Sequence, residues 1–145
     1  MFIRSTDLVS IRIYYKKINE KAHKYIAFNS EDLKEEAKKS GGFSILNVKM
    51  AELNWGIYND LQDEATIDVH LPNGETESKF SYKKFKESKL KRLLKSWDAT
   101  IEVDGEVAPM PVTEENILDL APPIAEAILS AYEDASYLTG ESEKN

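Results

Sequence analysis

Three carboxylates that could do acid–base chemistry lie close together in one predicted helix: Asp60, Asp63 and Glu64. Paired carboxylates act as acid and base when a pocket drives their pKa values apart. Nothing in the surrounding sequence indicates such a pocket. We therefore interpret this cluster as the solvated face of a helix.

A second acidic stretch, "DATIEVDG", holds Asp98, Glu102 and Asp104 ahead of Gly105. A calcium loop needs oxygen ligands at alternate positions before its glycine and a glutamate after it. Three apolar residues interrupt that pattern: Ala99, Ile101 and Val103. A turn at Asp104-Gly105 is the better prediction.

The other catalytic and ligand-binding motifs are missing from the sequence. His23 and His70 have no histidine or cysteine at ligand spacing, and the chain has no cysteine. Gly41-Gly42 lacks the pattern of a phosphate-binding loop, and no serine or threonine stands in a nucleophile elbow. We expect a protein that is not an enzyme, with no catalytic residues, no metal and no cofactor.

A basic helix at residues 83–95 is a stronger candidate for a functional site than any of these motifs. Its predicted basic face consists of Lys84, Lys91, Arg92 and Lys95. Such a face could neutralise phosphates, which makes a small nucleic-acid-binding module one alternative. However, the chain has a net charge of -7. The acidic C-terminal region, in the same molecule or in a neighbour, is the more attractive partner, and nucleic acid is not expected.

The length and charge distribution of the chain limit the classes of protein to which it can belong. The chain has 145 residues, 41% of them apolar, which suits one core. No apolar run is long enough to span a bilayer, and the N-terminus lacks a signal-peptide core, so we expect a protein used inside a cell. Residues 101–145 hold eleven acidic residues and one lysine, which leaves residues 1–100 net positive. Charge asymmetry of this kind can mark a self-complementary surface.

Strands and one helix are predicted in the first half of the chain. Alternation of Val9, Ile11, Ile13 and Tyr15 predicts a strand, with residues 22–28 as its antiparallel partner. Residues 29–42 predict one polar helix capped by Asn29 or Ser30, with Gly41 as its left-handed stop. A half-buried strand follows at 43–50, with its apolar face formed by Leu46, Val48 and Met50.

Two helices flank a predicted hairpin in the middle of the chain. Asn54 is a plausible N-cap for a helix whose apolar face holds Ile57, Tyr58, Leu61 and Ala65. Pro72-Asn73-Gly74 predicts the turn of a hairpin at 66–80. A helix is then predicted at 81–97, because four apolar residues follow helical spacing: Leu90, Leu93, Leu94 and Trp97.

The C-terminal region is punctuated by prolines. Asp98–Met110 is predicted as a loop or short ribbon, and Thr113 can cap a short helix. Pro122 and Pro123 begin a second helix, since proline is tolerated in a first turn. Its apolar side chains repeat at helical spacing: Ile124, Ile128, Ala131 and Ala135, with Tyr132 adjoining.

These elements predict an α+β fold of small antiparallel strand pairs packed with helices, followed by a helical C-terminal region. We expect a core domain at 1–97, a Pro/Gly connector at 98–112, a separable C-terminal helical arm at 113–138 and a flexible tail at 139–145. Trp97 would anchor the elbow between core and arm.

Two stretches carry a resemblance to a known family: "AELNWGIYNDLQDEA" and "KLKRLLKSWDATIEVDGEVAPMPVTEENILDLAPPIAEAILSAYEDA". A Leu-x-Trp step opens one helix, a Leu-rich helix ends in Ser-Trp, and Leu-x-Pro-Pro leads into the last helix. Residues 48–135 thus resemble small tail proteins of tailed bacteriophages and prophages, of the tail assembly chaperone kind. The resemblance implies a non-enzymatic role in tail assembly, with the tape-measure and tail-tube proteins as partners.

The expected location is the host bacterial cytoplasm during assembly, and the virion tail is a second expected place. A structural minor tail or neck component and a regulatory interaction module of a host cell remain alternatives. Self-association, weakened by salt, is a further expectation, and no membrane contact is expected. The predicted partner-binding residues, whose apolar contacts are internal or with a partner, are Trp55, Trp97, Ile117, Leu118, Ile124, Ile128 and Tyr132.

Overall fold

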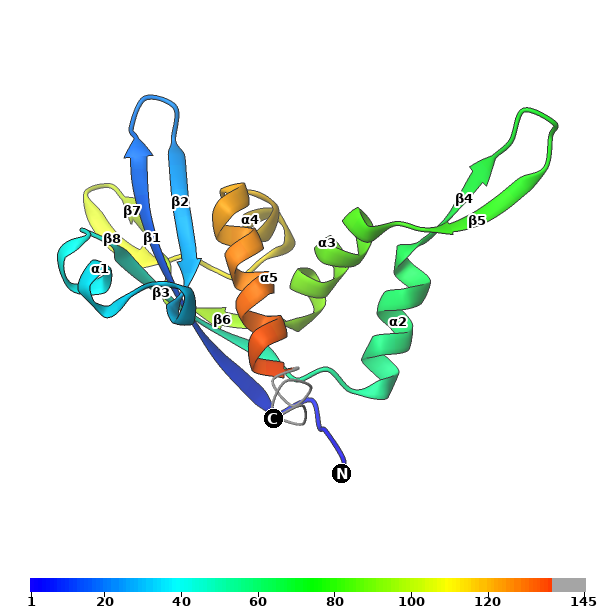
Figure 1. The fold of residues 1–145 in the computed structure, drawn as a ribbon, viewed down its shortest axis with the longest axis horizontal. Helices are drawn as coiled ribbons and strands as arrows, with labels where there is room; N and C mark the ends of the chain where they lie inside the picture. The colour runs from blue at the N-terminus through cyan, green and yellow to red at the C-terminus, as the bar shows by residue number, and fades with distance from the viewer. Residues whose placement is uncertain (137–145) are drawn as a thin grey trace.

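The computed structural model describes residues 1–136, and its fold class is α+β, as predicted. A four-stranded antiparallel sheet, in the order β2-β1-β3-β6, forms the centre of the molecule (Figure 1). The strands are β1 (Leu8–Asn19), β2 (Lys24–Asn29), β3 (Ser44–Ala51) and β6 (Leu94–Trp97). Within the described residues, no helix is long and apolar enough to cross a membrane.

One face of this sheet is buried under the last helix, α5 (Pro122–Ser136) (Figure 1). The register of β1 on β3 places Ile11 opposite Val48 and Ile13 opposite Leu46, so the predicted apolar faces of both strands coincide. All four side chains are buried with residues of α5 in one core. The Tyr132 hydroxyl, fully buried, donates a hydrogen bond of 2.9 Å to the carbonyl oxygen of Ala51. This bond satisfies a polar group that would be costly to bury alone.

The predicted separation of a core at 1–97 from a C-terminal helical arm at 113–138 is not what the structure shows. Helices α4 (Glu114–Leu118) and α5 contribute to the same core as β1 and β3. The reason is that the buried face of the sheet needs an apolar cover. Helix α5 provides this cover, since it packs against both β1 and β2. Residues 137–145, with the expected flexible tail at 139–145, lie outside the described residues.

The predicted single helix at 29–42 is broken in two. A 3₁₀ turn at Ser30–Asp32 is followed by α1 (Glu35–Ser40), and Leu33 between them is extended. The capping role of Asn29 is confirmed, since its side chain accepts from the Glu31 amide. Gly41 is right-handed, and Gly42 takes the left-handed conformation with φ of 69°. A short polar helix with a thin apolar stripe is stabilised little by packing. A break in it therefore lowers the stability of the protein only slightly.

A projection formed by residues 54–93 extends from the sheet (Figure 1). It consists of α2 (Trp55–Ala65), a hairpin of β4 (Thr66–His70) and β5 (Thr76–Phe80), and α3 (Tyr82–Leu93). The predicted N-cap is confirmed: the Asn54 side chain accepts from the Ile57 amide at 2.9 Å. The predicted Asn-Gly turn is also confirmed, with Gly74 at a φ of 85°. Helices α2 and α3 pack together and bury Leu61 and Ala65.

The helix predicted at 81–97 ends at Leu93, and residues 94–97 form strand β6. Leu94 pairs with Met50 and Trp97 with Val48 across the sheet. Leu90, Leu93 and Leu94 are still buried in the core. The prediction of helix at residues 94–97 was wrong. As a strand, these residues form hydrogen bonds with the N–H and C=O groups on the edge of β3, which a longer α3 would leave unpaired.

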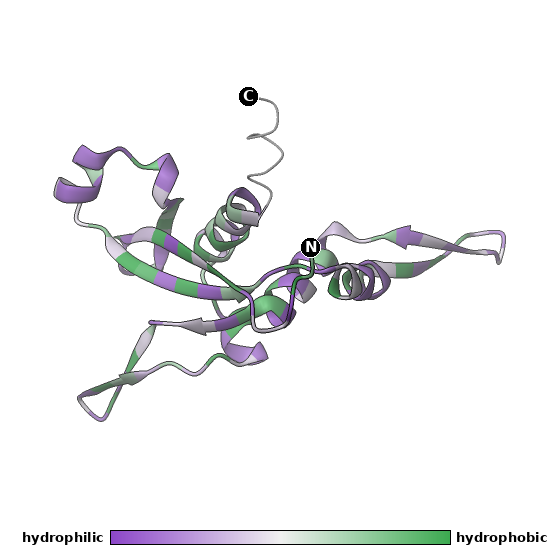
Figure 2. Ribbon diagram, turned by 90° about the horizontal axis from the view of Figure 1, so that it is seen from below, coloured by the Kyte–Doolittle hydropathy of each residue, from purple (hydrophilic) through white to green (hydrophobic). Residues whose placement is uncertain are grey.

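The predicted ribbon between α3 and α4 is a second hairpin, of β7 (Thr100–Val103) and β8 (Glu106–Pro109). Asp104 and Gly105 form its turn with positive φ of 53° and 81°. At its base, the Trp97 indole donates to the Met110 carbonyl oxygen at 2.6 Å. Figure 2 shows this hairpin extending from the body on the side opposite to β4 and β5.

Candidate interaction surface

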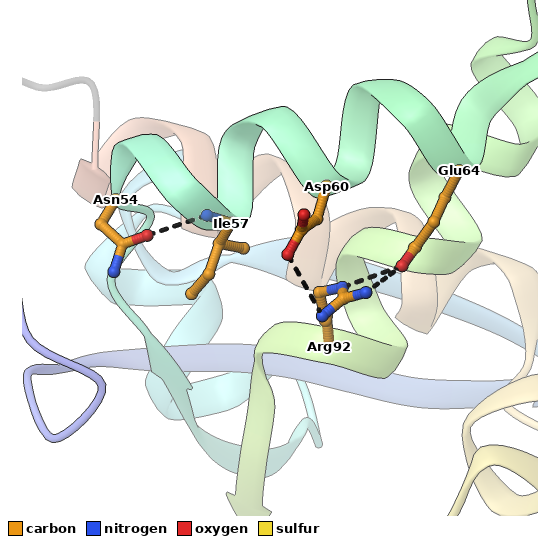
Figure 3. A network of polar contacts seen from close by, with 5 residues as sticks. All are labelled: Asn54, Ile57, Asp60, Glu64 and Arg92. Carbon is orange, nitrogen blue, oxygen red and sulfur yellow. Dashed lines mark hydrogen bonds and ion pairs between the residues drawn. The ribbon is translucent and has the colours of Figure 1, made fainter.

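Two carboxylates of the predicted acidic cluster on α2, Asp60 and Glu64, contact Arg92 of α3 (Figure 3). Arg92 of α3 donates from Nε to Glu64 at 3.0 Å and lies 3.8 Å from Asp60. The hydrogen bond from Arg92 lowers the pKa of the Glu64 carboxyl, and the same bond raises the pKa of Arg92. Glu64 and Asp60 are therefore partners of Arg92, which is a structural role. Within residues 1–136, no group of histidine, aspartate and glutamate is arranged to hold a metal ion.

The basic helix pairs with the acidic C-terminal region of its own molecule. Lys86 contacts Glu126 of α5 at 2.7 Å, and Lys89 lies 3.6 Å from Glu133. The hydrogen bond to Glu126 raises the pKa of Lys86. These pairs correspond to the intramolecular alternative considered from the sequence. The residues of the predicted basic face lie elsewhere: Arg92 pairs with Glu64 of α2, Lys84 and Lys95 are exposed, and Lys91 is half-buried.

Lys89 is buried, with 3% of its surface exposed, which the sequence did not indicate. Its Nζ lies 5.7 Å from the centre of the Phe85 ring and 5.2 Å from that of Tyr132. Burial lowers the pKa of Lys89, while the charge of Glu133 opposes that shift. Cation–π contacts of this kind strengthen when water is excluded. Lys89 therefore joins α3 to α5 through its aliphatic stem and its ammonium group.

We expect the stability contributed by Lys89 to rise with pH in the alkaline range. Its folded pKa lies below its ordinary value of 10.5, so between those two values the unfolded chain binds more protons than the folded one. The free energy of unfolding should therefore increase with pH relative to a Lys89→Met variant, as pH approaches 10.5. Urea denaturation of both proteins between pH 8 and 10 measures this. Parallel curves for the two proteins would show that Lys89 titrates like an exposed lysine.

Most of the predicted partner-binding residues lie inside the protein. Four are buried in the core: Ile117, Ile124, Ile128 and Tyr132. Trp97 is half-buried at the base of the β7–β8 hairpin. Their apolar contacts are therefore internal, which was the other interpretation open from the sequence. Trp55 and Leu118 are exposed, with 76% and 55% of their surfaces accessible.

Trp55 belongs to a surface that we call the Trp55 surface, formed by Trp55 and Tyr58 with Ile3 beside them. The Trp55 and Tyr58 rings stack, with centroids 6.0 Å apart and an interplanar angle of 19°. The Asn54 side chain donates to the carbonyl oxygen of Ile3 at 3.2 Å, which holds the N-terminal segment beside the start of α2. The side chains of Ile3, Trp55 and Tyr58 are exposed. Such a grouping is typical of a protein interaction site.

The sequence did not identify Tyr58 and Ile3 as members of this surface. Tyr58 was expected on the buried face of α2, but the face that packs inward carries Ile57 and Leu61. The spacing of Trp55 and Tyr58, one turn apart in the first turns of a helix, was the available signal. Ile3 gave no signal, because its position depends on the long-range bond to Asn54.

Comparisons with protein-family models, with curated proteins and with solved structures find no match to this chain.

Proposed function

We propose that this chain is a non-enzymatic tail protein of tailed bacteriophages that acts in tail assembly. In this proposal it binds the tape-measure and tail-tube proteins, as tail assembly chaperones do. The resemblance of residues 48–135 to such proteins supports the proposal. The structural observation that carries it is the exposed, stacked pair of Trp55 and Tyr58, which lies inside the first of the two resembling stretches.

The physical argument starts from the exposed aromatic rings. Tryptophan and tyrosine are the side chains that most often dominate the binding energy of an interface. Trp55 and Tyr58 lie on a helix whose N-cap is formed and whose position against α3 is held by Arg92 (Figure 3). The rings are therefore presented in one orientation before binding. A partner that covers them loses less conformational freedom than one that must order a loop.

The shape of the projection also suits assembly with other proteins. The β4–β5 hairpin extends beyond α2 and α3 (Figure 1). A two-stranded hairpin alone is marginally stable in water, so contact with a neighbouring protein would stabilise it. Phe80 at its base is half exposed, with 50% of its surface accessible.

Co-expression tests the proposal. We expect the chain to co-purify with the tape-measure protein and with the tail-tube protein encoded in the same phage genome. Failure of both to co-purify, under conditions in which each is folded, would contradict the proposal. The alternative, a minor tail or neck component, predicts stoichiometric amounts of the chain in purified virions. A chaperone would be absent from them.

A further inference from the structure

Residues 50–78, which run from the end of β3 through α2 into the β4–β5 hairpin, form an acidic segment. They contain seven aspartates and glutamates but no lysine or arginine. Arg92 of α3 pairs with two of these carboxylates, Asp60 and Glu64 (Figure 3). The other five have no ion pair within residues 1–136: Glu52, Asp63, Asp68, Glu75 and Glu77. This segment therefore carries negative charge that its own molecule does not neutralise.

One of the unpaired carboxylates, Asp63, lies on the same exposed side of α2 as Trp55. The two residues are eight positions apart with Asn59 midway between them, and residues four positions apart are neighbours on a helix surface. All three side chains are exposed. At a rise of about 1.5 Å per residue, Trp55 and Asp63 lie about 12 Å apart along the helix axis. This side of α2 thus presents an aromatic ring at one end and a carboxylate at the other.

The aromatic end of this side favours a cation. The faces of tryptophan and tyrosine rings attract guanidinium and ammonium groups. Lysines of this chain lie over other tyrosine rings, Lys86 over Tyr82 at 5.4 Å for example. In the part of the chain that the structure describes, no cation lies over Trp55 or Tyr58. Trp55 remains 76% exposed although it stacks on Tyr58, so its ring is open to a cation from outside the molecule.

The carboxylate end favours the same kind of group. Arginine suits both ends, because its planar guanidinium stacks on aromatic rings and donates two parallel N–H groups to a carboxylate. An acidic segment or a nucleic acid would be repelled by the unpaired carboxylates of residues 50–78. A purely apolar segment would cover Asp63 without pairing it, and the burial of an unpaired carboxylate is costly. Charge complementarity therefore selects a basic partner.

We infer that the Trp55 surface and Asp63 together bind a basic, amphipathic segment of a protein partner. A cationic side chain of that segment pairs with Asp63, and a second cationic or apolar side chain packs on the Trp55 and Tyr58 rings. The inference rests on the proposed function, which identifies the partner as a tail protein, and it adds the chemistry of the segment that is bound.

Two synthetic amphipathic peptides test the inference without any tail protein. One is built from leucine and arginine, and in the other every arginine is replaced by glutamate. Fluorescence anisotropy of the labelled peptides with the full chain at low salt measures their binding. We expect the arginine peptide to bind and the glutamate peptide to bind at least tenfold more weakly. Trp55→Ala should weaken binding of the arginine peptide at least tenfold, because the ring contact is lost.

A matched pair of substitutions separates a specific contact from general attraction to an acidic protein. Asp63→Lys and Glu102→Lys change the net charge equally, both at exposed positions, and Glu102 lies on β7 outside the acidic segment. Asp63→Lys should weaken binding of the arginine peptide about fivefold or more, and Glu102→Lys less than about twofold. Thermal unfolding verifies that both variants keep the fold. At 1 M salt, where the screening length falls to about 3 Å, binding of the arginine peptide should weaken.

Equal binding of the two peptides would overturn the inference, and so would equal losses in Asp63→Lys and Glu102→Lys. Either result leaves the proposed function standing, because a tail partner can dock through contacts other than a basic segment. Failure of both tail proteins to co-purify, while the arginine peptide binds as expected, would instead contradict the proposed function and leave the basic-segment site in place.

Discussion

Removal of residues 98–145 is expected to unfold the protein. The deletion takes away α5, whose Ile124, Ile128 and Tyr132 share one core with the sheet. Full burial of a large apolar side chain contributes about 1.5–3 kcal/mol. Three such losses amount to about 4.5–9 kcal/mol, which is comparable to the roughly 5–15 kcal/mol by which a domain is stable. The remaining fragment would also expose the apolar face of β1 and β3 to water.

A point substitution makes the same prediction quantitative. Ile128→Ala should lower the free energy of unfolding by about 2–5 kcal/mol, because it opens a cavity at a fully buried position. Leu118→Ala, on the neighbouring helix but exposed, is the matched control and should change it by about 0.5 kcal/mol or less. Urea denaturation followed by circular dichroism measures both. A cooperative transition in the 1–97 fragment would show that α5 is not required for the core.

Alternation of apolar and polar residues was enough to predict the main strands. Ile11, Ile13, Val48 and Met50 alternate with polar residues, and each lies on the buried face of the sheet. The end of α3 could not be predicted in this way. Leu90, Leu93 and Leu94 are buried in the core whether Leu94 is helical or extended. The choice depends on the edge of β3, which lies far away in the sequence.

The candidate site was harder to predict than the strands. An apolar face on a helix looks the same whether it packs on its own sheet or on a partner, and Ile124 and Ile128 proved to be core residues. Lys89 belongs to a run of lysines, so nothing marked it as the buried one. Trp55 was predicted as a partner-binding residue, but its exposure could not be predicted, because exposure on α2 depends on where α3 packs against it.

Substitution of Trp55 by alanine is expected to weaken binding to a tail partner at least tenfold. Truncation of a central aromatic residue in an interface typically costs about 2 kcal/mol or more. A loss of about 1.4 kcal/mol already corresponds to a tenfold change in affinity. Trp55 is exposed in the free chain, so the substitution should leave the fold intact. Unchanged thermal unfolding of Trp55→Ala would verify this.

Tyr82→Ala is the matched control for this substitution. Tyr82 is also an exposed aromatic residue on a helix, with 61% of its surface accessible, but it lies at the start of α3 and outside the Trp55 surface. Its replacement should change the affinity for a tail partner by less than about threefold, since isolated surface substitutions have small effects. Comparison of the two variants shows whether binding depends on the Trp55 surface or on any exposed aromatic side chain.

Isothermal titration calorimetry of the purified chain with the tail-tube protein, and separately with the tape-measure protein, tests the central claim most directly. We predict measurable binding to both proteins, with Trp55→Ala weakening at least one of the two by tenfold or more and Tyr82→Ala leaving both unchanged. Absence of binding to both proteins would contradict the proposed function. Equal affinities for Trp55→Ala and the unmodified chain would instead contradict the role of the Trp55 surface.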